Sequence, residues 1–314
     1  MKSETAIKKI LEKLHAGFGE SSAVMLGGGT SRSEVTEVIP TGIEVFDKHV
    51  LGCGGLAVGK LHELAGDEGA GKSALTYQCL AATQRMGGIA LLVETEEALS
   101  TERAQTFGVD LDQLVVIQPD YMEMGLSQME ASLQAIQAGT GPVLLAWDSI
   151  AATPTKKEFE EGMDVGAEMG ERARILSRAC RILLPLAQRK RTALLFVNQI
   201  RQKIGVMYGD PTTTPGGNAV KFHASFRAHV SSGKAIKDSE EHTGKYVNLR
   251  AKKNRFAEPH RGAALRLDFK TGWNDAWSTL DFAKERGVVK DNARGDKALA
   301  EARSALGWAA PPTA

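Results

Sequence analysis

Residues 66–73, GDEGAGKS, have the spacing G-x-x-x-x-G-K-[ST], with Gly66, Gly71, Lys72 and Ser73 in its fixed positions. Glycines at these positions let backbone N–H groups wrap around a polyphosphate, and the lysine ammonium meets the charge of its β- and γ-phosphates. The serine hydroxyl is suited to ligate Mg²⁺. The spacing therefore predicts a phosphate-binding loop, whose remaining members are Asp67, Glu68, Gly69 and Ala70.

Acidic residues that could complete such a site follow two other apolar runs. Asp148 ends the run LLAWD, where a carboxylate can hold Mg²⁺ or its water. A carboxylate in that place is also typical of a helix N-cap, but the phosphate loop favours the metal role. Glu94, Glu96 and Glu97 follow IALLV, at the carboxyl end of a predicted strand, where a carboxylate can accept a proton from an attacking water. Three glutamates are equally compatible with a solvated face, and their spacing does not choose among them.

The order of apolar runs and helical stretches predicts how these residues are brought together. Continuous apolar strands separated by helices indicate an α/β fold, with a mostly parallel central sheet covered by helices on both faces. The predicted strands are 60–65, 89–94, 113–118, 142–148 and 192–199, and the predicted helices are 73–85, 101–107, 124–138 and 170–190. The phosphate loop then joins a strand to a helix, as a phosphate site of this kind requires.

Three further segments surround this core. Residues 6–14 place apolar side chains on one side of a predicted helix, which either packs on its own domain or docks on a neighbouring subunit. Residues 225–232 and 245–254 predict a hairpin whose strands are joined by a polar loop, 233–244. The C-terminal segment carries a short predicted helix near 296–306. The expected parts are 1–33, a helical arm and linker; 34–269, the ATPase core; and 270–314, a short C-terminal segment.

Composition limits the possible partners. The 314-residue chain has a formal net charge of +1, so any nucleic-acid site must be a local basic stripe. Three distant cysteines match no metal spacing and fit a reducing compartment, which predicts a cytoplasmic protein. No apolar run is long enough to predict a transmembrane helix.

Five segments, in this order, resemble the bacterial RecA recombinase family: GDEGAGKS, VETEEAL, LLAWDS, the run from Phe196 to Phe222, and AKKNRF. The resemblance spans about residues 6–270, and the 27-residue run from Phe196 to Phe222 is its most specific part. It implies a DNA-dependent ATPase that uses ATP and Mg²⁺, forms a helical filament on single-stranded DNA, and exchanges strands with a homologous duplex.

The resemblance also assigns roles in the ATP site. It implies that Lys72 and Ser73 bind phosphate and Mg²⁺, that Glu96 is the catalytic glutamate, and that Asp148 is the second acidic residue. It places Gln199 as the sensor of the γ-phosphate, and Ser100 and Arg103 around the adenine. It implies that Lys253 and Arg255 reach the ATP of the adjacent protomer and that Phe222 lies at the same interface. It also implies that the N-terminal helix docks on the neighbouring subunit.

Two loops are implied to carry DNA, one within 160–174 and one within 200–217. Glycine backbone N–H groups and cationic side chains can bind phosphates, and an exposed apolar side chain can wedge between bases. A surface loop with a buried anchor is the alternative. The implied DNA-binding residues are Met169, Arg174, Ser177, Arg181, Arg201, Gln202, Lys203, Ile204, Gly216 and Gly217.

The chain departs from the family pattern at several positions. Glu94 stands where the family usually has Asp, and Ser100 and Arg103 replace an Asp and a Tyr at the base. Gln202 replaces a Met and Pro215 a Thr in the second loop. Ala276, with Trp277 beside it, stands near an expected tyrosine, and the C-terminal segment is short and lacks an acidic tail.

Two other functions share parts of this pattern. A ring-shaped helicase would use the same phosphate loop but has no need of NQIRQKIGVMYGDP. A DNA-bound filament scaffold that promotes repressor self-cleavage would keep both loops, with repressors or accessory recombination proteins as partners.

Overall fold

The computed structural model describes residues 2–19, 22–26, 31, 34–162, 170–202 and 212–308. The chain forms two compact units, Met1–Thr36 and Glu37–Ala314. The first contains helix α1 (Lys2–Phe18), so the helix predicted at 6–14 is confirmed and is longer at both ends. Ile7 and Ile10 on α1 are 42% and 58% exposed. The predicted three-part division of the chain stays a prediction.

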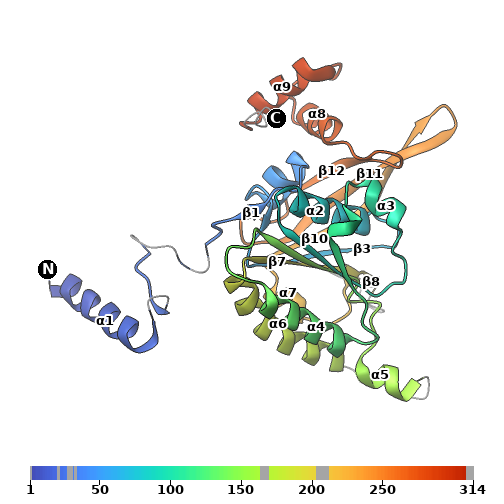
Figure 1. The fold of residues 1–314 in the computed structure, drawn as a ribbon. Coiled ribbons are helices and arrows are strands. Elements are labelled where there is room, and N and C mark those ends of the chain that lie inside the picture. The colour runs from blue at the N-terminus through green and yellow to red at the C-terminus, as the bar shows by residue number, and fades with distance from the viewer. Residues whose placement is uncertain are drawn as a thin grey trace. The chain divides into compact units, whose positions relative to one another are not determined.

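A nine-stranded sheet forms the middle of the second unit (Figure 1), and its order is β13-β12-β11-β10-β3-β7-β6-β4-β5. The strands from β10 to β5 in that order are parallel, and β11, β12 and β13 are added in antiparallel fashion. The predicted α/β fold with a mostly parallel sheet is confirmed. The strands are β3 (Leu61–Gly66), β4 (Ile89–Glu94), β5 (Leu114–Ile117), β6 (Val143–Asp148), β7 (Thr192–Gln199), β10 (Phe226–Asp238), β11 (Glu241–Asn254), β12 (Gly262–Asp268) and β13 (Gly272–Trp273).

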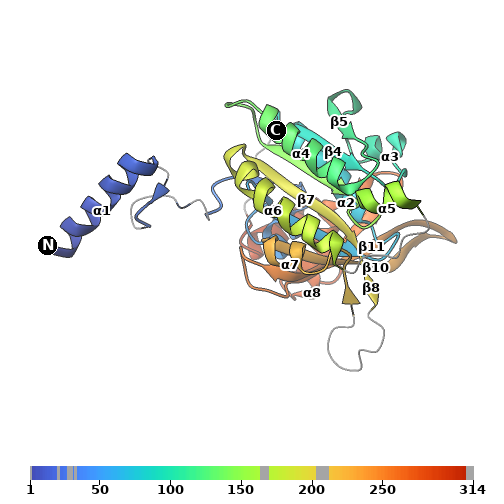
Figure 2. The ribbon, with the colours of Figure 1, turned by 90° about the horizontal axis from the view of Figure 1, so that it is seen from below.

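Helices lie on both faces of this sheet (Figure 2). One face packs against α2 (Lys72–Arg85) and the π-helical segment η2 (Val45–Leu51). The other packs against α4 (Met122–Ala135), α6 (Glu171–Arg189) and α7 (Ala219–His223). The remaining elements are β1 (Val38–Ile39), β2 (Leu56–Ala57), α3 (Thr101–Thr106), the 3₁₀ turn η3 (Leu111–Gln113), α5 (Lys156–Glu161), β8 (Arg201–Gln202), β9 (Thr212–Thr213), α8 (Asp275–Glu285) and α9 (Gly295–Ala305).

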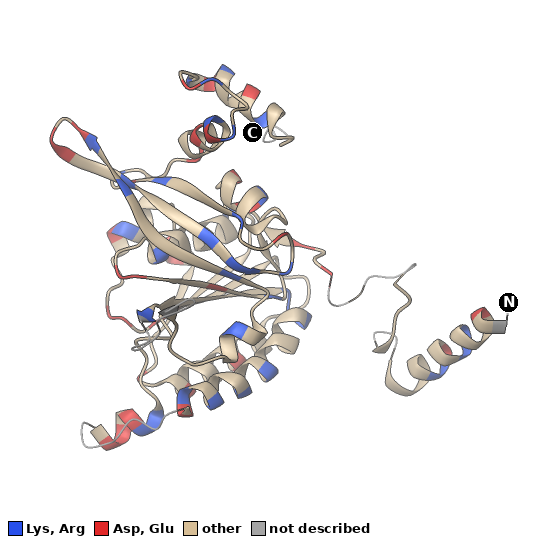
Figure 3. Cartoon of the chain, turned by 180° about the vertical axis from the view of Figure 1, so that it is seen from behind, with Lys and Arg blue, Asp and Glu red and all other residues tan. Residues whose placement is uncertain are grey.

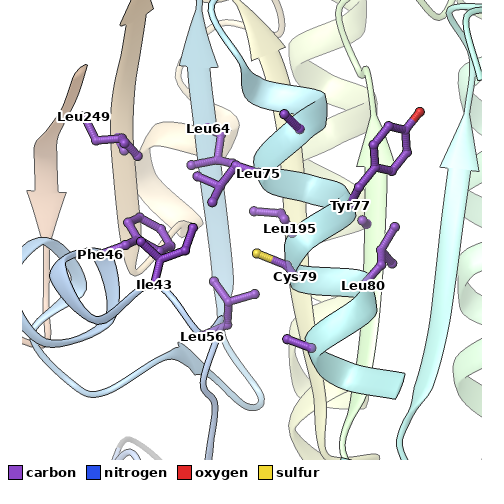
Figure 4. Close-up of a cluster of buried hydrophobic side chains, with 14 of the residues drawn as sticks. Ile43, Phe46, Leu56, Leu64, Leu75, Tyr77, Cys79, Leu80, Leu195 and Leu249 are labelled. Atoms are coloured by element: carbon purple, nitrogen blue, oxygen red, sulfur yellow. The ribbon is translucent and has the colours of Figure 1, made fainter. Parts of the chain in front are cut away.

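The apolar strands are buried on both faces because successive side chains point to opposite sides of the sheet. On β6, Leu144 and Ala146 belong to the cluster around α2, whereas Leu145 and Trp147 belong to the cluster around α4 and α6. Figure 4 shows the first cluster, in which side chains of α2 pack against those of β3 and β7. This double burial explains why the strands read as continuous apolar runs.

Two predicted regions differ from the structure. The polar loop predicted at 233–244 is wrong, because β10 and β11 continue as a ribbon to a tight turn at Ser239, with φ 56°, and Glu240. This ribbon extends beyond the rest of the sheet (Figure 1) and has no apolar face to mark it as strand. Helix α8 was not predicted. Asn274 caps its N-terminus by accepting from Trp277 N, and α8 buries Leu280 and Ala283 in a cluster with α9.

Candidate active site

The phosphate loop joins β3 to α2 as predicted. Gly66 ends β3, where a Cβ atom would lie 2.0 Å from Val230 O on the neighbouring strand. Gly71 has φ 105°, a left-handed conformation that side chains rarely adopt, and α2 begins at Lys72. Lys72 Nζ donates to Gly66 O at 3.0 Å and to Asp67 O at 2.6 Å, so the ammonium lies within the curve of the loop. Burial lowers the pKa of Lys72, against the opposing effect of Asp148 and Glu96.

A cavity of about 680 Å³ opens at this loop and gathers most of the predicted ATP-site residues. They come from the carboxyl ends of β3, β7, β6 and β4, which are consecutive in the sheet. The predicted residues that line it are Glu68, Gly69, Ala70, Gly71, Lys72, Ser73, Glu96, Ser100, Arg103, Asp148 and Gln199. Gly66 and Asp67 contact Lys72 from the same loop.

Asp148 and Ser73 face each other in this cavity. Asp148 ends β6, is 9% exposed, and accepts a hydrogen bond from the Ser73 hydroxyl. Burial raises the pKa of Asp148 from 3.8 to about 6, and nearby Glu96 adds to the rise while Ser73 and Lys72 oppose it. In the described residues no three His, Cys, Asp or Glu side chains cluster as a metal site. A nucleotide-bound Mg²⁺ needs only one or two protein oxygens, since phosphates and water supply the others, and Ser73 with Asp148 fit that requirement.

The structure gives different environments to the three glutamates among which the sequence did not choose a catalytic base. Glu94 is buried, and its Oε1 accepts from Glu96 N at 3.0 Å and Ala98 N at 3.2 Å, so it braces the loop after β4. Glu96 Oε1 accepts from Ser149 Oγ and from Gln199 Nε2, the latter at 3.4 Å. Glu97 is exposed, and the described residues around the cavity do not include it. Glu96 is therefore the glutamate that combines exposure with contacts at the site.

Another part of the cavity lining is cationic and aromatic. Ser100 caps α3 by accepting from Arg103 N at 3.2 Å, and Arg103 lines the cavity with Phe269. Lys245 Nζ donates to Gly69 O and, at 3.2 Å, to Ser232 Oγ. Burial lowers the pKa of Lys245, and Arg103 and Lys72 lower it further. The sequence analysis missed Lys245, Phe269 and Tyr77, which also line the cavity, because their positions on a strand, in a turn and on a helix carry no motif.

The ends of the second predicted DNA loop are held on the core. Strands β8 and β9 pair Arg201 with Thr213 and Gln202 with Thr212. Asn198 Nδ2 donates to Pro215 O at 3.2 Å. A Cβ atom at Gly216 would lie 2.5 Å from Leu176 Cδ1 of α6, so this end of the loop packs closely on that helix. Gly217 approaches Ala173 in the same way. Lys203, Ile204 and Met169 lie outside the described residues, as does the side chain of Gln202.

Lys and Arg residues occur along α6 and the β10–β11 ribbon, where the cartoon is blue (Figure 3). Arg174 and Arg181 are exposed and stand two turns apart on one face of α6. Ser177 lies between them, and its Oγ accepts from Arg181 Nη1 at 3.0 Å. These three predicted residues thus form one polar stripe that begins beside Gly216 and Gly217.

Lys253 and Arg255 are not among the described residues that line the cavity. Lys253 Nζ donates to Lys221 O at 2.7 Å and to Phe222 O at 2.9 Å. Burial lowers the pKa of Lys253, and so do Arg255 and Arg227. Phe222 is 71% exposed, and Arg255 is exposed just beyond the end of β11.

The regular alternation of side chains along β11 is interrupted at Lys252. Arg227 pairs with Lys253 and Ala228 with Ala251, so Lys252 is the extra residue of a β-bulge. Arg255 follows the last residue of the strand, so strand alternation does not set the direction of its side chain.

The helices give no sign of a membrane span: in the described part of the chain, none combines the necessary length with sufficient apolar character.

Comparison with known proteins accords with this arrangement. Residues 5–274 match the family model described as the RecA N-terminal domain. Protein RecA of Francisella philomiragia is 38% identical over 290 residues, which cover 92% of this chain and 79% of that protein. Protein RecA of Bacteroides thetaiotaomicron is 37% identical over 285 residues, which cover 91% of this chain and 84% of that protein. The chain therefore belongs to the RecA family of recombinases, DNA-dependent ATPases that exchange strands between homologous DNA molecules.

Proposed function

We propose that this chain hydrolyses ATP with Mg²⁺ in the 680 Å³ cavity, forms a helical filament on single-stranded DNA, and pairs that strand with a homologous duplex. One observation carries the proposal. The phosphate loop, the Ser73–Asp148 pair and the Glu96–Gln199 pair all meet in this cavity. These are the parts that phosphoryl transfer to water needs, namely a phosphate cradle, a metal site and a group that orients water.

Lys72 and the loop amides would bind the phosphates. The Lys72 ammonium now donates to two neutral carbonyls, and a phosphate oxygen is a stronger, charged acceptor for the same group. Ser73 and Asp148 would hold Mg²⁺, which withdraws charge from the phosphate oxygens when bound. Asp148 fits this role because burial disfavours its free carboxylate and a divalent cation restores the charged form.

Glu96 would orient and deprotonate the attacking water. The Ser149 hydroxyl and the Gln199 amide both donate to Glu96 Oε1, so the carboxylate is held in one direction. Gln199 ends β7 and is followed by the predicted second DNA loop, so it would lie between the phosphate and the DNA. A change at the γ-phosphate would therefore reach that loop through Gln199.

Lys253 and Arg255 would act on the ATP of the next protomer. In the single chain both lie outside the described lining of the nucleotide cavity, and Lys253 contacts the exposed Phe222. Cations supplied across a subunit boundary stabilise the charge of phosphoryl transfer, so activity would depend on assembly. We place the protein in the cytoplasm with its DNA, where repressors or accessory recombination proteins would meet the filament.

Electron microscopy with a non-hydrolysable ATP analogue and single-stranded DNA tests this function together with an ATPase assay. We expect helical filaments, phosphate release that rises on adding single-stranded DNA, and exchange of a homologous duplex strand. Closed rings, or hydrolysis indifferent to DNA, would overturn the proposal.

A further inference from the structure

A line of polar side chains crosses one face of the central sheet near the site. It consists of Asn198 on β7, Glu63 on β3, Arg227 on β10 and Lys253 on β11. These four strands are consecutive neighbours in the sheet. We refer to the four residues as the cross-sheet ladder.

Glu63 is the centre of the ladder. Its side chain is 0% exposed, and a buried carboxylate is costly unless it is paired and hydrogen-bonded. Glu63 Oε2 accepts from Arg227 Nε, and Glu63 Oε1 accepts from Asn198 Nδ2 at 3.0 Å. Strand pairing fixes these partners, since Arg227 stands opposite Glu63 in the parallel register of β3 and β10. Asn198 lies on the same side of β7 as Phe196, the register partner of Glu63.

Asn198 connects this centre to both the nucleotide and the DNA side. Asn198 Oδ1 accepts from Gln199 N at 3.0 Å, and the Gln199 side chain donates to Glu96 in the nucleotide cavity. The Asn198 amide nitrogen is shared between Glu63 Oε1 and Pro215 O, the latter at the end of the second DNA loop. The position of Asn198 is therefore constrained by three groups at once.

Arg227 connects the centre to the predicted subunit boundary. Arg227 and Lys253 are register partners on antiparallel strands, so their side chains lie on one face. Two adjacent cations repel each other, and the charge of Glu63 offsets that repulsion for both. Lys253 in turn donates to the carbonyl of Phe222.

We propose that Glu63 is a positioning residue that couples the nucleotide site to the second DNA loop and to the cations directed at the next protomer. The inference rests on the proposed function, because it gives the ladder a role in ATP-dependent DNA binding. A shift of Gln199 against a γ-phosphate displaces Asn198, and Asn198 is bonded to both Pro215 and Glu63. Arg227 then follows Glu63, and its displacement changes the surroundings of Lys253.

Glu63→Gln tests the coupling, because it preserves the size of the side chain and removes the charge that holds Arg227. ATP affinity without DNA, measured with a fluorescent ATP analogue, should stay within about twofold, since the described lining of the cavity does not include Glu63. Stimulation of hydrolysis by single-stranded DNA should fall about tenfold, a usual size for coupling between two sites. If Glu63→Gln does not fold, Glu63→Gln/Arg227→Met removes both charges together, which buried ion pairs tolerate better, and should show the same loss.

Glu44→Gln is the matched control. Glu44 also forms a shielded ion pair, accepting from Arg303 Nε and from Lys48 Nζ, but it lies away from the ladder. The Glu44→Gln variant should have a lower midpoint of thermal unfolding, and single-stranded DNA should stimulate its ATP hydrolysis as much as that of the native chain. Native stimulation in Glu63→Gln, or an equal loss in Glu44→Gln, would overturn the coupling role. If single-stranded DNA does not stimulate ATP hydrolysis by the native chain, the proposed function itself is refuted, independently of the results for the variants.

Discussion

Glu96 is exposed in the cavity and accepts from Ser149 and Gln199, and this environment determines what removal of its charge should do. Glu96→Gln should still bind Mg·ATP but hydrolyse it about 10²-fold more slowly or worse, the scale of losing a positioned base. Lys72→Ala should instead abolish productive nucleotide binding. Nucleotide binding and phosphate release, measured separately, distinguish the two effects.

Glu97→Gln serves as the control for Glu96, because Glu97 is exposed and is not among the described residues of the cavity lining. It should keep the native rate. Native hydrolysis by Glu96→Gln would contradict the assignment, and Glu94 would then be the next glutamate to test.

The buried Asp148 should make the free energy of unfolding depend on pH. Burial raises its pKa from 3.8 to about 6, so the folded state binds this proton more tightly than the unfolded state does. The resulting stabilisation is complete below about pH 4 and is lost as the pH rises through about 6. A difference of about two pKa units corresponds to about 3 kcal/mol. Asp148→Asn should therefore be more stable than the native chain above pH 6 and similar to it near pH 4.

Urea unfolding at several pH values checks this expectation, with the exposed Asp120→Asn as a control whose stability parallels the native chain throughout. Binding of Mg·ATP to the native chain should also weaken as the pH falls through 6, because a protonated Asp148 is a poor Mg²⁺ ligand. A gain in stability that is constant with pH would show that burial of the charge is not its cause.

At the scale of the element, α6 follows the first predicted DNA loop and packs against the end of the second. Arg174 and Arg181 share one face of the helix, whereas Arg189 stands in its last turn. Arg174→Gln/Arg181→Gln should weaken binding of single-stranded DNA for all sequences alike. It should also lower the slope of log affinity against log salt by up to about two units, one for each lost phosphate contact.

Arg189→Gln removes the same kind of charge from the same helix and should leave both affinity and slope near native values. Fluorescence anisotropy over a range of salt concentrations measures both quantities. Equal slopes for the double variant and the native chain would remove this face of α6 from the DNA path.

The elements also show which parts of the fold could be predicted from the sequence. The strands before Gly66, Glu94 and Asp148 were predictable because double burial makes each a continuous apolar run. The inner strands of the β10–β11 ribbon were predicted as a hairpin, but its outer part was not, because that part is exposed on both faces and lacks an apolar period. Lys245 reaches the phosphate loop only through the pairing of strands distant in sequence, which no local spacing encodes.

At the scale of the whole molecule, hydrolysis should require a neighbour. Lys72→Ala protein and Lys253→Ala/Arg255→Ala protein should each be inactive alone, and a mixture should recover part of the ATPase activity. Some interfaces in the mixture pair an intact phosphate loop with intact basic residues from the next protomer. A steady-state assay over mixing ratios, with co-assembly checked by crosslinking, measures the recovery. If the proteins co-assemble and no ratio restores activity, Lys253 and Arg255 are only a charged strand end that discourages edge pairing.

The order of the central sheet has a consequence for amide hydrogen exchange. The strands that carry Gly66, Asp148 and Gln199 are β3, β6 and β7, which are adjacent to one another and flanked by further strands on both sides. Their backbone N–H groups can exchange only when a large part of the domain opens. The tip of the β10–β11 ribbon and the short edge strand β5 can exchange by local opening. The frame of the catalytic cavity is thus expected to be the slowest-exchanging part of the protein, so that denaturant removes this frame only when the whole domain unfolds.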